Sequence, residues 1–120
     1  ENCDMIILPG GMPGTTNLAA HQGLIRQIQA FAGKGKWIAA ICAAPMVLGD
    51  ISLLKGKKAT IYPGLEEHLV GAEFCADRVV PNGNIVTSMG PGTAMEFALK
   101  LAEILMGEQK ASEVRKALLV

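Results

Sequence analysis

Long apolar runs and an excess of charge of either sign are both missing from this 120-residue sequence. No run approaches the roughly 20 apolar residues that span a bilayer, so no membrane segment is expected. Lysine plus arginine and aspartate plus glutamate each number 11, and the net charge is zero. Because no basic stripe with interleaved aromatics is present, nucleic acid is not expected as a partner. The first four residues carry no basic group, so we expect no secretory signal there.

Cysteine and histidine are also scarce. The three cysteines, Cys3, Cys42 and Cys75, are odd in number and form no C-x-x-C pair. This argues against a disulfide framework or a structural zinc site, and it favours a reducing compartment, so we expect a cytoplasmic protein. His21 and His68 are far apart in the sequence, and no metal site is expected from them.

Aromatic residues make up only 4% of the chain, although half of all residues are hydrophobic. A core of this size must therefore be built from aliphatic side chains and methionine. The length predicts a single domain over residues 1–120.

Short apolar runs bounded by turn residues alternate with segments whose apolar residues recur at the spacing of an amphipathic helix. Buried strands are predicted at residues 5–8, 37–41 and 58–62, and a hairpin at 79–87 with a type I′ turn at Asn82-Gly83. Helices are predicted around residues 24–31, 45–54, 65–70, 94–106 and 111–119. The fourth begins with a Thr93–Glu96 capping box and ends at Gly107. Near-continuous apolar strands alternating with helices indicate an α/β fold with a mostly parallel sheet covered on both faces.

The chain opens almost directly on the strand at residues 5–8, which has the composition of a core strand. Exposed apolar strand edges are a liability, so a core strand needs neighbours on both sides. We expect that an N-terminal part is missing, either cut away or present as another polypeptide. The alternative is a small complete domain with an edge strand first.

A predicted strand, a cysteine and a helix start coincide at Cys42. Ala40 and Ala44, two residues before and after it, are small enough for a strand to turn into a helix at close quarters. Pro45 suits the first helical turn. This is the layout of a nucleophile elbow, with cysteine in place of serine, and a nearby helix N-terminus favours the thiolate. An inert core cysteine is the alternative, and it is the interpretation for Cys3 and Cys75.

A second loop follows the strand at residues 5–8. Gly10 and Gly11 allow backbone N–H groups to point into a cleft. In a parallel sheet this loop and the Cys42 turn share one edge, so the amides of Gly10, Gly11 and Ala43 are predicted to form an oxyanion hole. An ordinary turn remains the alternative.

Three motifs, in this order, resemble the DJ-1/ThiJ branch of the DJ-1/PfpI family, over essentially the whole chain. They are Leu8-Pro9-Gly10-Gly11, Ala39-Ala40-Ile41-Cys42-Ala43, and Thr87-Ser88-Met89-Gly90-Pro91-Gly92-Thr93 followed by Glu96-Phe97-Ala98. The resemblance implies a flavodoxin-like three-layer sandwich of which this chain is the C-terminal two thirds, without the first strand–helix section. It also implies a homodimer.

For the site, the resemblance makes Cys42 an easily oxidised nucleophile that needs no cofactor, and it places Pro91 in a loop lining the pocket. The family's partner for this cysteine is a glutamate of the early section, and no residue here matches it. Where many relatives have a histidine before a proline, this chain has Tyr62, whose hydroxyl is a hydrogen-bond donor. The protease branch has histidine directly after the cysteine, whereas this chain has Ala43. A late His-x-Glu of the glutaminase type is absent too, so protease and glutaminase activities are not expected.

The resemblance implies an enzyme of the glyoxalase III or deglycase kind, acting on small reactive carbonyls through the Cys42 thiolate. A second hypothesis is a redox-sensing or chaperone-like stress protein, in which Cys42 is oxidised without turnover. The third is a plain domain whose cysteine is unused.

Overall fold

The structure is a computed structural model that describes residues 3–12 and 14–119. Residues 1–2, 13 and 120 of the predicted domain lie outside this description. The strands of the main sheet stand in the order β1 (Met5–Leu8), β2 (Trp37–Ile41), β6 (Ile85–Ser88) and β5 (Val79–Asn82). The first three of these are parallel, and β5 pairs antiparallel with β6. The predicted α/β class with a mostly parallel sheet is confirmed.

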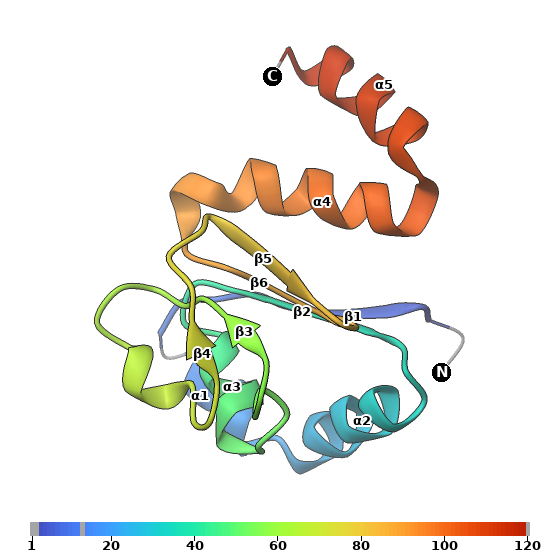
Figure 1. The fold of residues 1–120 in the computed structure, drawn as a ribbon. Coiled ribbons are helices and arrows are strands. Elements are labelled where there is room, and N and C mark those ends of the chain that lie inside the picture. The colour runs from blue at the N-terminus through green and yellow to red at the C-terminus, as the bar shows by residue number, and fades with distance from the viewer. Residues whose placement is uncertain (1–2, 13, 120) are drawn as a thin grey trace.

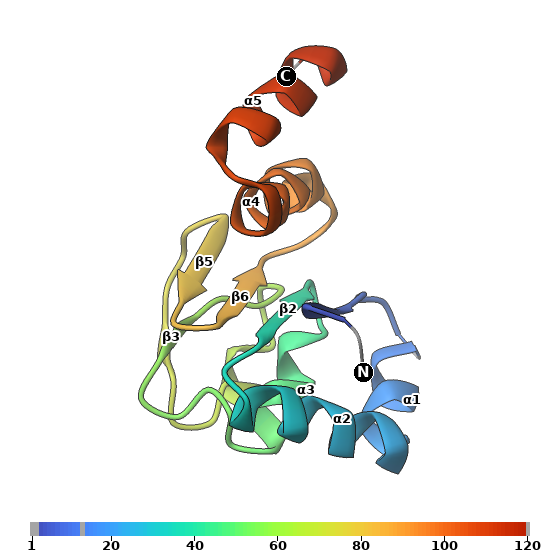
Figure 2. The same cartoon turned by 90° about the vertical axis from the view of Figure 1, so that its right-hand side faces the viewer.

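Helices cover both faces of the sheet (Figures 1 and 2). On one face lie α1 (Gly14–Ala20), α2 (Gln22–Gly33) and α3 (Pro45–Asp50). On the other lies α4 (Ala94–Met106), and α5 (Glu108–Leu118) packs against the outer side of α4. These layers form the predicted flavodoxin-like three-layer sandwich. No helix in the described part of the chain is long and apolar enough to cross a membrane.

The strand register brings three loops to one edge of the sheet. Leu8 at the end of β1 lies opposite Ala40 of β2, and Ile41 lies opposite Ser88 at the end of β6. The middle of β2 is fully buried, with 0% exposure from Ile38 to Ala40. Because parallel strands end at the same edge, the loops after β1, β2 and β6 lie side by side there.

Helix α2 follows its predicted apolar stripe, but α1 was not predicted. Ile28 and Phe31 of α2 are buried, and the His21 ring caps its N-terminus by accepting a backbone N–H. Helix α1 begins with residues of low helix propensity, which hides it from sequence patterns. It is anchored by Thr15, whose N–H and hydroxyl both donate to the Gly11 carbonyl at 2.8 Å.

The strand predicted at residues 58–62 is shorter than expected. Within this segment only β3 (Lys58–Ala59) forms a strand, and it pairs with β4 (Glu73–Phe74) in a separate two-stranded parallel sheet. The next residue leaves this ladder because its backbone N–H donates to a side chain, from Thr60 to the Thr87 hydroxyl at 2.9 Å. The main sheet therefore gains no strand from this segment.

Helix boundaries differ from the prediction in three places. The helix from Pro45 ends at Asp50 rather than residue 54, and Ser52 just beyond it has a left-handed φ of 63°. The segment at 65–70 forms only a 3₁₀ turn, η1 (Glu66–His68). The last helix begins at residue 108, three residues before the predicted start. Single residues in left-handed backbone and short turns leave little periodic signal, which explains these errors.

The hairpin of β5 and β6 is confirmed, but its turn type is not. Asn82 pairs with Ile85, so the two turn residues are Gly83 and Asn84. Of these only Gly83 has positive φ, at 61°. A type I′ turn needs positive φ at both positions, and a glycine at the first alone is the pattern of type II′.

Thr60 yields a stability prediction, because its buried hydroxyl has no hydrogen-bond partner within the described residues. Replacing it by the similarly shaped valine removes a desolvated polar group, so Thr60→Val is expected to raise the free energy of unfolding by about 1 kcal/mol. Urea unfolding measures the change, with Thr16→Val on the exposed side of α1 as the matched control. A clear loss of stability in Thr60→Val would show that the hydroxyl has a partner.

Candidate functional site

Cys42 lies on a sharp turn between β2 and α3, as predicted. Its φ is 66°, a left-handed conformation that is uncommon for a residue other than glycine. Two hydrogen bonds fix this backbone: the Cys42 N–H donates to the Ser88 carbonyl at 3.0 Å, and its own carbonyl accepts from the Tyr62 N–H at 2.8 Å. The side chain is only partly exposed. The strand, turn and helix therefore hold the thiol in a defined position.

The loop after β1 is in direct contact with this turn. A Cβ added at Gly10 would lie 2.5 Å from the Cys42 Cβ and 2.8 Å from the Ile41 carbonyl oxygen, so only glycine fits there. The amides of Gly10, Gly11 and Ala43 donate no hydrogen bond to any residue in the described ranges. The three predicted oxyanion-hole residues are thus grouped around Cys42 with their donors unused.

Two cavities meet at Cys42. The first is about 400 Å³ and has Tyr62 in its wall; it is lined by Gly11, Met12, Cys42, Ala43, Tyr62, Pro63, Gly64 and Leu65. The second is about 340 Å³ and has Pro91 in its wall; it is lined by Gly10, Gly11, Ile41, Cys42, Pro91 and Ala94. Tyr62 and Pro91 therefore lie in the walls of different cavities on either side of the cysteine.

Among the residues that the structure describes, no charged side chain and no histidine lines either cavity. His21 caps α2, and His68 Nδ1 lies 3.9 Å from an Asp50 carboxylate oxygen, away from Cys42. Within residues 3–12 and 14–119, no three acidic, cysteine or histidine side chains are grouped so as to hold a metal ion. The polar groups of the site are therefore uncharged: the backbone N–H groups, the Tyr62 hydroxyl and the thiol itself.

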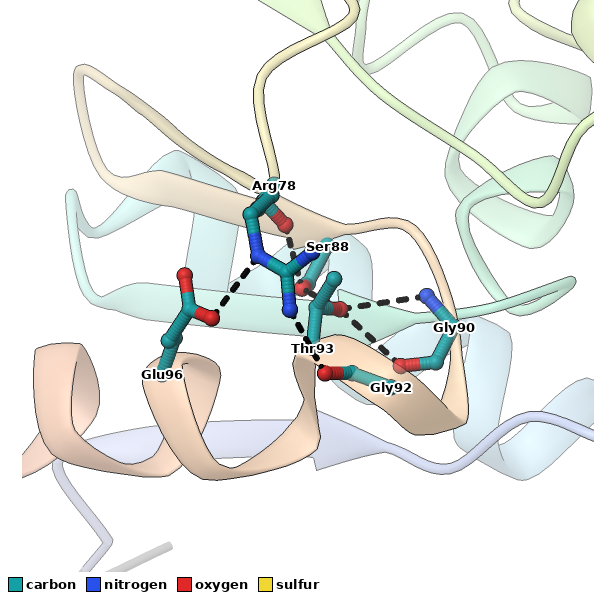
Figure 3. A network of polar contacts seen from close by, with 6 residues as sticks. All are labelled: Arg78, Ser88, Gly90, Gly92, Thr93 and Glu96. Atoms are coloured by element: carbon teal, nitrogen blue, oxygen red, sulfur yellow. Dashed lines mark hydrogen bonds and ion pairs between the residues drawn. The ribbon is translucent and has the colours of Figure 1, made fainter. Parts of the chain in front are cut away.

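A polar network behind the site was missed by sequence reasoning (Figure 3). Thr93 does not share a capping box with Glu96. Its hydroxyl lies 2.6 Å from the Ser88 hydroxyl and contacts the N–H and carbonyl of Gly90. Glu96 instead accepts from Arg78 at 2.7 Å. The capping-box prediction is wrong because tertiary partners outcompete the local one, and the only available signal was the density of hydroxyls in the Thr87–Thr93 motif.

Comparisons with known proteins agree with this geometry. Residues 1–104 match the DJ-1/PfpI family. Protein dj-1beta of Drosophila melanogaster is 44% identical over 122 residues, a match that covers all of this chain and 65% of the fly protein. The glutathione-independent glyoxalase DJR-1.2 of Caenorhabditis elegans is 36% identical, with 96% of this chain and 62% of that protein covered.

Solved structures show the same fold. The crystal structure of Drosophila melanogaster DJ-1beta superposes with a TM-score of 0.95 at 43% identity, and covers all of this chain and 66% of that one. Oxidized Toxoplasma gondii DJ-1 gives a TM-score of 0.94 at 40% identity, covering 99% of this chain and 65% of that one. The chain thus spans about two thirds of the length of these relatives. By its sequence match and its fold, the chain belongs to the DJ-1/PfpI family.

Proposed function

We propose that this chain carries the reactive centre of a cysteine-dependent, cofactor-free enzyme that acts on small reactive carbonyls. The observation that carries the proposal is the grouping of unused amides around Cys42, whose backbone is held in a left-handed turn. Such donors stabilise negative charge on a sulfur or on a carbonyl oxygen. Because α3 has only six residues, individual N–H groups supply most of this effect rather than a long helix dipole.

The chemistry begins with addition of the Cys42 thiolate to an aldehyde carbon. The π electrons of the C=O bond move to oxygen, which gives a hemithioacetal oxyanion held by the amides of Gly10, Gly11 and Ala43. For a 2-oxoaldehyde, shifting one proton from the aldehyde carbon to the neighbouring carbon gives a thioester. Water then releases a 2-hydroxy acid and regenerates the thiolate. The resemblance assigns the proton transfer to a glutamate that no residue of this sequence matches.

The walls of the site suit a neutral substrate. Both cavities are predominantly apolar, and neither places a cationic side chain where it would pair with a carboxylate. The Caenorhabditis elegans relative is named a glutathione-independent glyoxalase, which is consistent with a 2-oxoaldehyde handled by the protein's own thiol. Methylglyoxal is therefore the substrate of choice for a test.

Replacing the nucleophile tests the proposal. Cys42→Ser is expected to reduce turnover of methylglyoxal to the uncatalysed background, because serine is a far weaker nucleophile without an adjacent base. Cys75→Ser serves as the control, since Cys75 lies outside both cavities and its thiol donates a hydrogen bond to the Asp77 carboxylate. Lactate formation without added glutathione is the measurement. Equal rates for the two variants would refute a role for Cys42. No turnover by the wild-type chain together with the N-terminal section that would carry the glutamate would refute the enzyme proposal.

The close approach of Gly10 gives a second test. In Gly10→Ala the new methyl group collides with the Cys42 turn, which must shift away from the amides. A displacement of this kind is expected to cost about 100-fold in kcat/KM. Gly33→Ala in α2 is the matched control, because a Cβ there meets nothing within 4 Å. The account fails here if both variants turn over methylglyoxal at the wild-type rate.

A redox-sensing or chaperone-like role is the second candidate. The Toxoplasma gondii relative with the same fold was solved in an oxidized form, which favours oxidation chemistry in this family. The partly buried Cys42 thiol would take up peroxide oxygen once per chain, and the unused amides would stabilise the resulting acid. Stoichiometric oxidation that Cys42→Ser abolishes, in a protein that does not consume methylglyoxal, would select this role.

We further propose that the protein acts in the cytoplasm as a homodimer and that another polypeptide segment pairs with β1. The exposed side chains of Met95, Leu105 and Met106 on α4 support a dimer contact, and Ile7 on the edge strand, 51% exposed, supports the added segment.

Native mass spectrometry tests both partners. It is expected to show complexes with two copies of this 12.6 kDa chain, and purified natural protein is expected to carry a companion fragment. A lone chain at micromolar concentration would contradict the proposed assembly.

A further inference from the structure

The hydroxyls of Ser88 and Thr93 form a buried pair behind the Cys42 site (Figure 3). Their oxygens are 2.6 Å apart, and the two residues are 0% and 6% exposed. The Ser88 hydroxyl also donates to the Arg78 carbonyl at 2.6 Å. The Gly90 N–H donates to the Thr93 hydroxyl at 3.2 Å, and Gly90 is itself buried.

The Ser88 and Thr93 hydroxyls each have a single proton to donate. A carbonyl only accepts, so the Ser88 hydroxyl donates to Arg78. The Gly90 carbonyl accepts both the Thr93 backbone N–H and the Thr93 hydroxyl, each at 2.9 Å. The contact between the two hydroxyls joins these two sets of bonds, so the pair connects both polar groups of Gly90 to the Arg78 carbonyl. Loss of either hydroxyl removes the contact between them and at least one further hydrogen bond.

This hydrogen-bond network is connected to the reactive cysteine. The Ser88 carbonyl accepts the Cys42 N–H, and the residue at the other end, Gly90, packs against the Tyr62 ring. A Cβ at Gly90 would lie 3.3 Å from that ring. Between Gly90 and Thr93 stands Pro91, which lines the second cavity beside Cys42. The hydroxyl pair thus anchors both a wall of the site and the strand end that holds the nucleophile.

We propose that Ser88 and Thr93 are positioning residues for Cys42. Their hydroxyl pair fixes the turn at residues 90–93 and so sets how large an electrophile can reach the thiol past Pro91. Neither hydroxyl belongs to the cavity linings, so both act through the turn rather than on the substrate. The inference rests on Cys42 being the reactive residue of the proposed function, but it is tested with thiol reagents and does not require carbonyl turnover.

The experiment compares Thr93→Val with Thr93→Ser in the full chain carrying Cys3→Ser and Cys75→Ser. Valine keeps the shape but removes the hydroxyl, so the buried Gly90 N–H loses its acceptor and the turn must move toward water. The measured quantity is the ratio of two alkylation rates of Cys42, the rate with N-ethylmaleimide divided by the rate with the smaller iodoacetamide. This ratio is expected to rise about tenfold in Thr93→Val. Serine retains the hydroxyl, and its ratio is expected to stay at the wild-type value.

Thr60→Val controls for loss of a buried threonine hydroxyl elsewhere, and its ratio should not change. Circular dichroism at the assay temperature confirms that each variant is folded. An unchanged ratio in Thr93→Val, or an equal rise in Thr93→Ser, would overturn the proposal. A protein that alkylates as expected but never converts methylglyoxal would refute the enzyme proposal alone.

If Thr93→Val does not fold, Ser88→Ala takes its place with the same expected rise. The wild-type chain decides if both fail: hydrogen exchange at the Gly90 amide must be slow, as its bond to Thr93 requires. Exchange as fast as in an unstructured peptide would overturn the proposal.

Discussion

The left-handed backbone of Cys42 is the constraint on which the site depends. Such a conformation costs roughly 1–3 kcal/mol in a residue other than glycine, and it persists only where the surroundings enforce it. Here the end of β6 binds the Cys42 N–H and the segment at Tyr62 binds its carbonyl. The backbone N–H and carbonyl of Cys42 are thus both hydrogen-bonded, and together they hold Cys42 in this turn at the end of the strand.

The parallel sheet makes this arrangement possible. Its register places the ends of β1, β2 and β6 at one edge, so that a glycine loop, the cysteine turn and the Pro91 turn meet there. The closest contact, between Gly10 and Cys42, leaves no room for a side chain. No charged side chain of the described residues lines the cavities, so backbone N–H groups and the Tyr62 hydroxyl are the donors present beside the thiol. The proposed function uses the backbone N–H groups to stabilise a developing negative charge.

The sequence was sufficient for features that depend on local chemistry. The apolar run of β2, the small residues after it and Pro45 predicted the turn that presents Cys42, and Gly10-Gly11 predicted the loop beside it. It failed where a tertiary hydrogen bond replaced a local one. Thr60 leaves its strand because its N–H binds Thr87, and the Thr93 hydroxyl binds Ser88 instead of closing a capping box. Partners brought together only by folding leave no periodic signal in a single sequence.

Site-resolved labelling of the three cysteines in one sample tests the central claim most directly. The wild-type chain is treated with limiting iodoacetamide at neutral pH, and the alkylated fraction of each cysteine is read by peptide mass spectrometry. Although Cys3 is exposed and Cys42 only partly so, we expect Cys42 to react about tenfold faster than either other cysteine if the neighbouring amides act on its sulfur as proposed. Rates that follow exposure, with Cys3 fastest and Cys42 no faster than a free model thiol, would contradict the account.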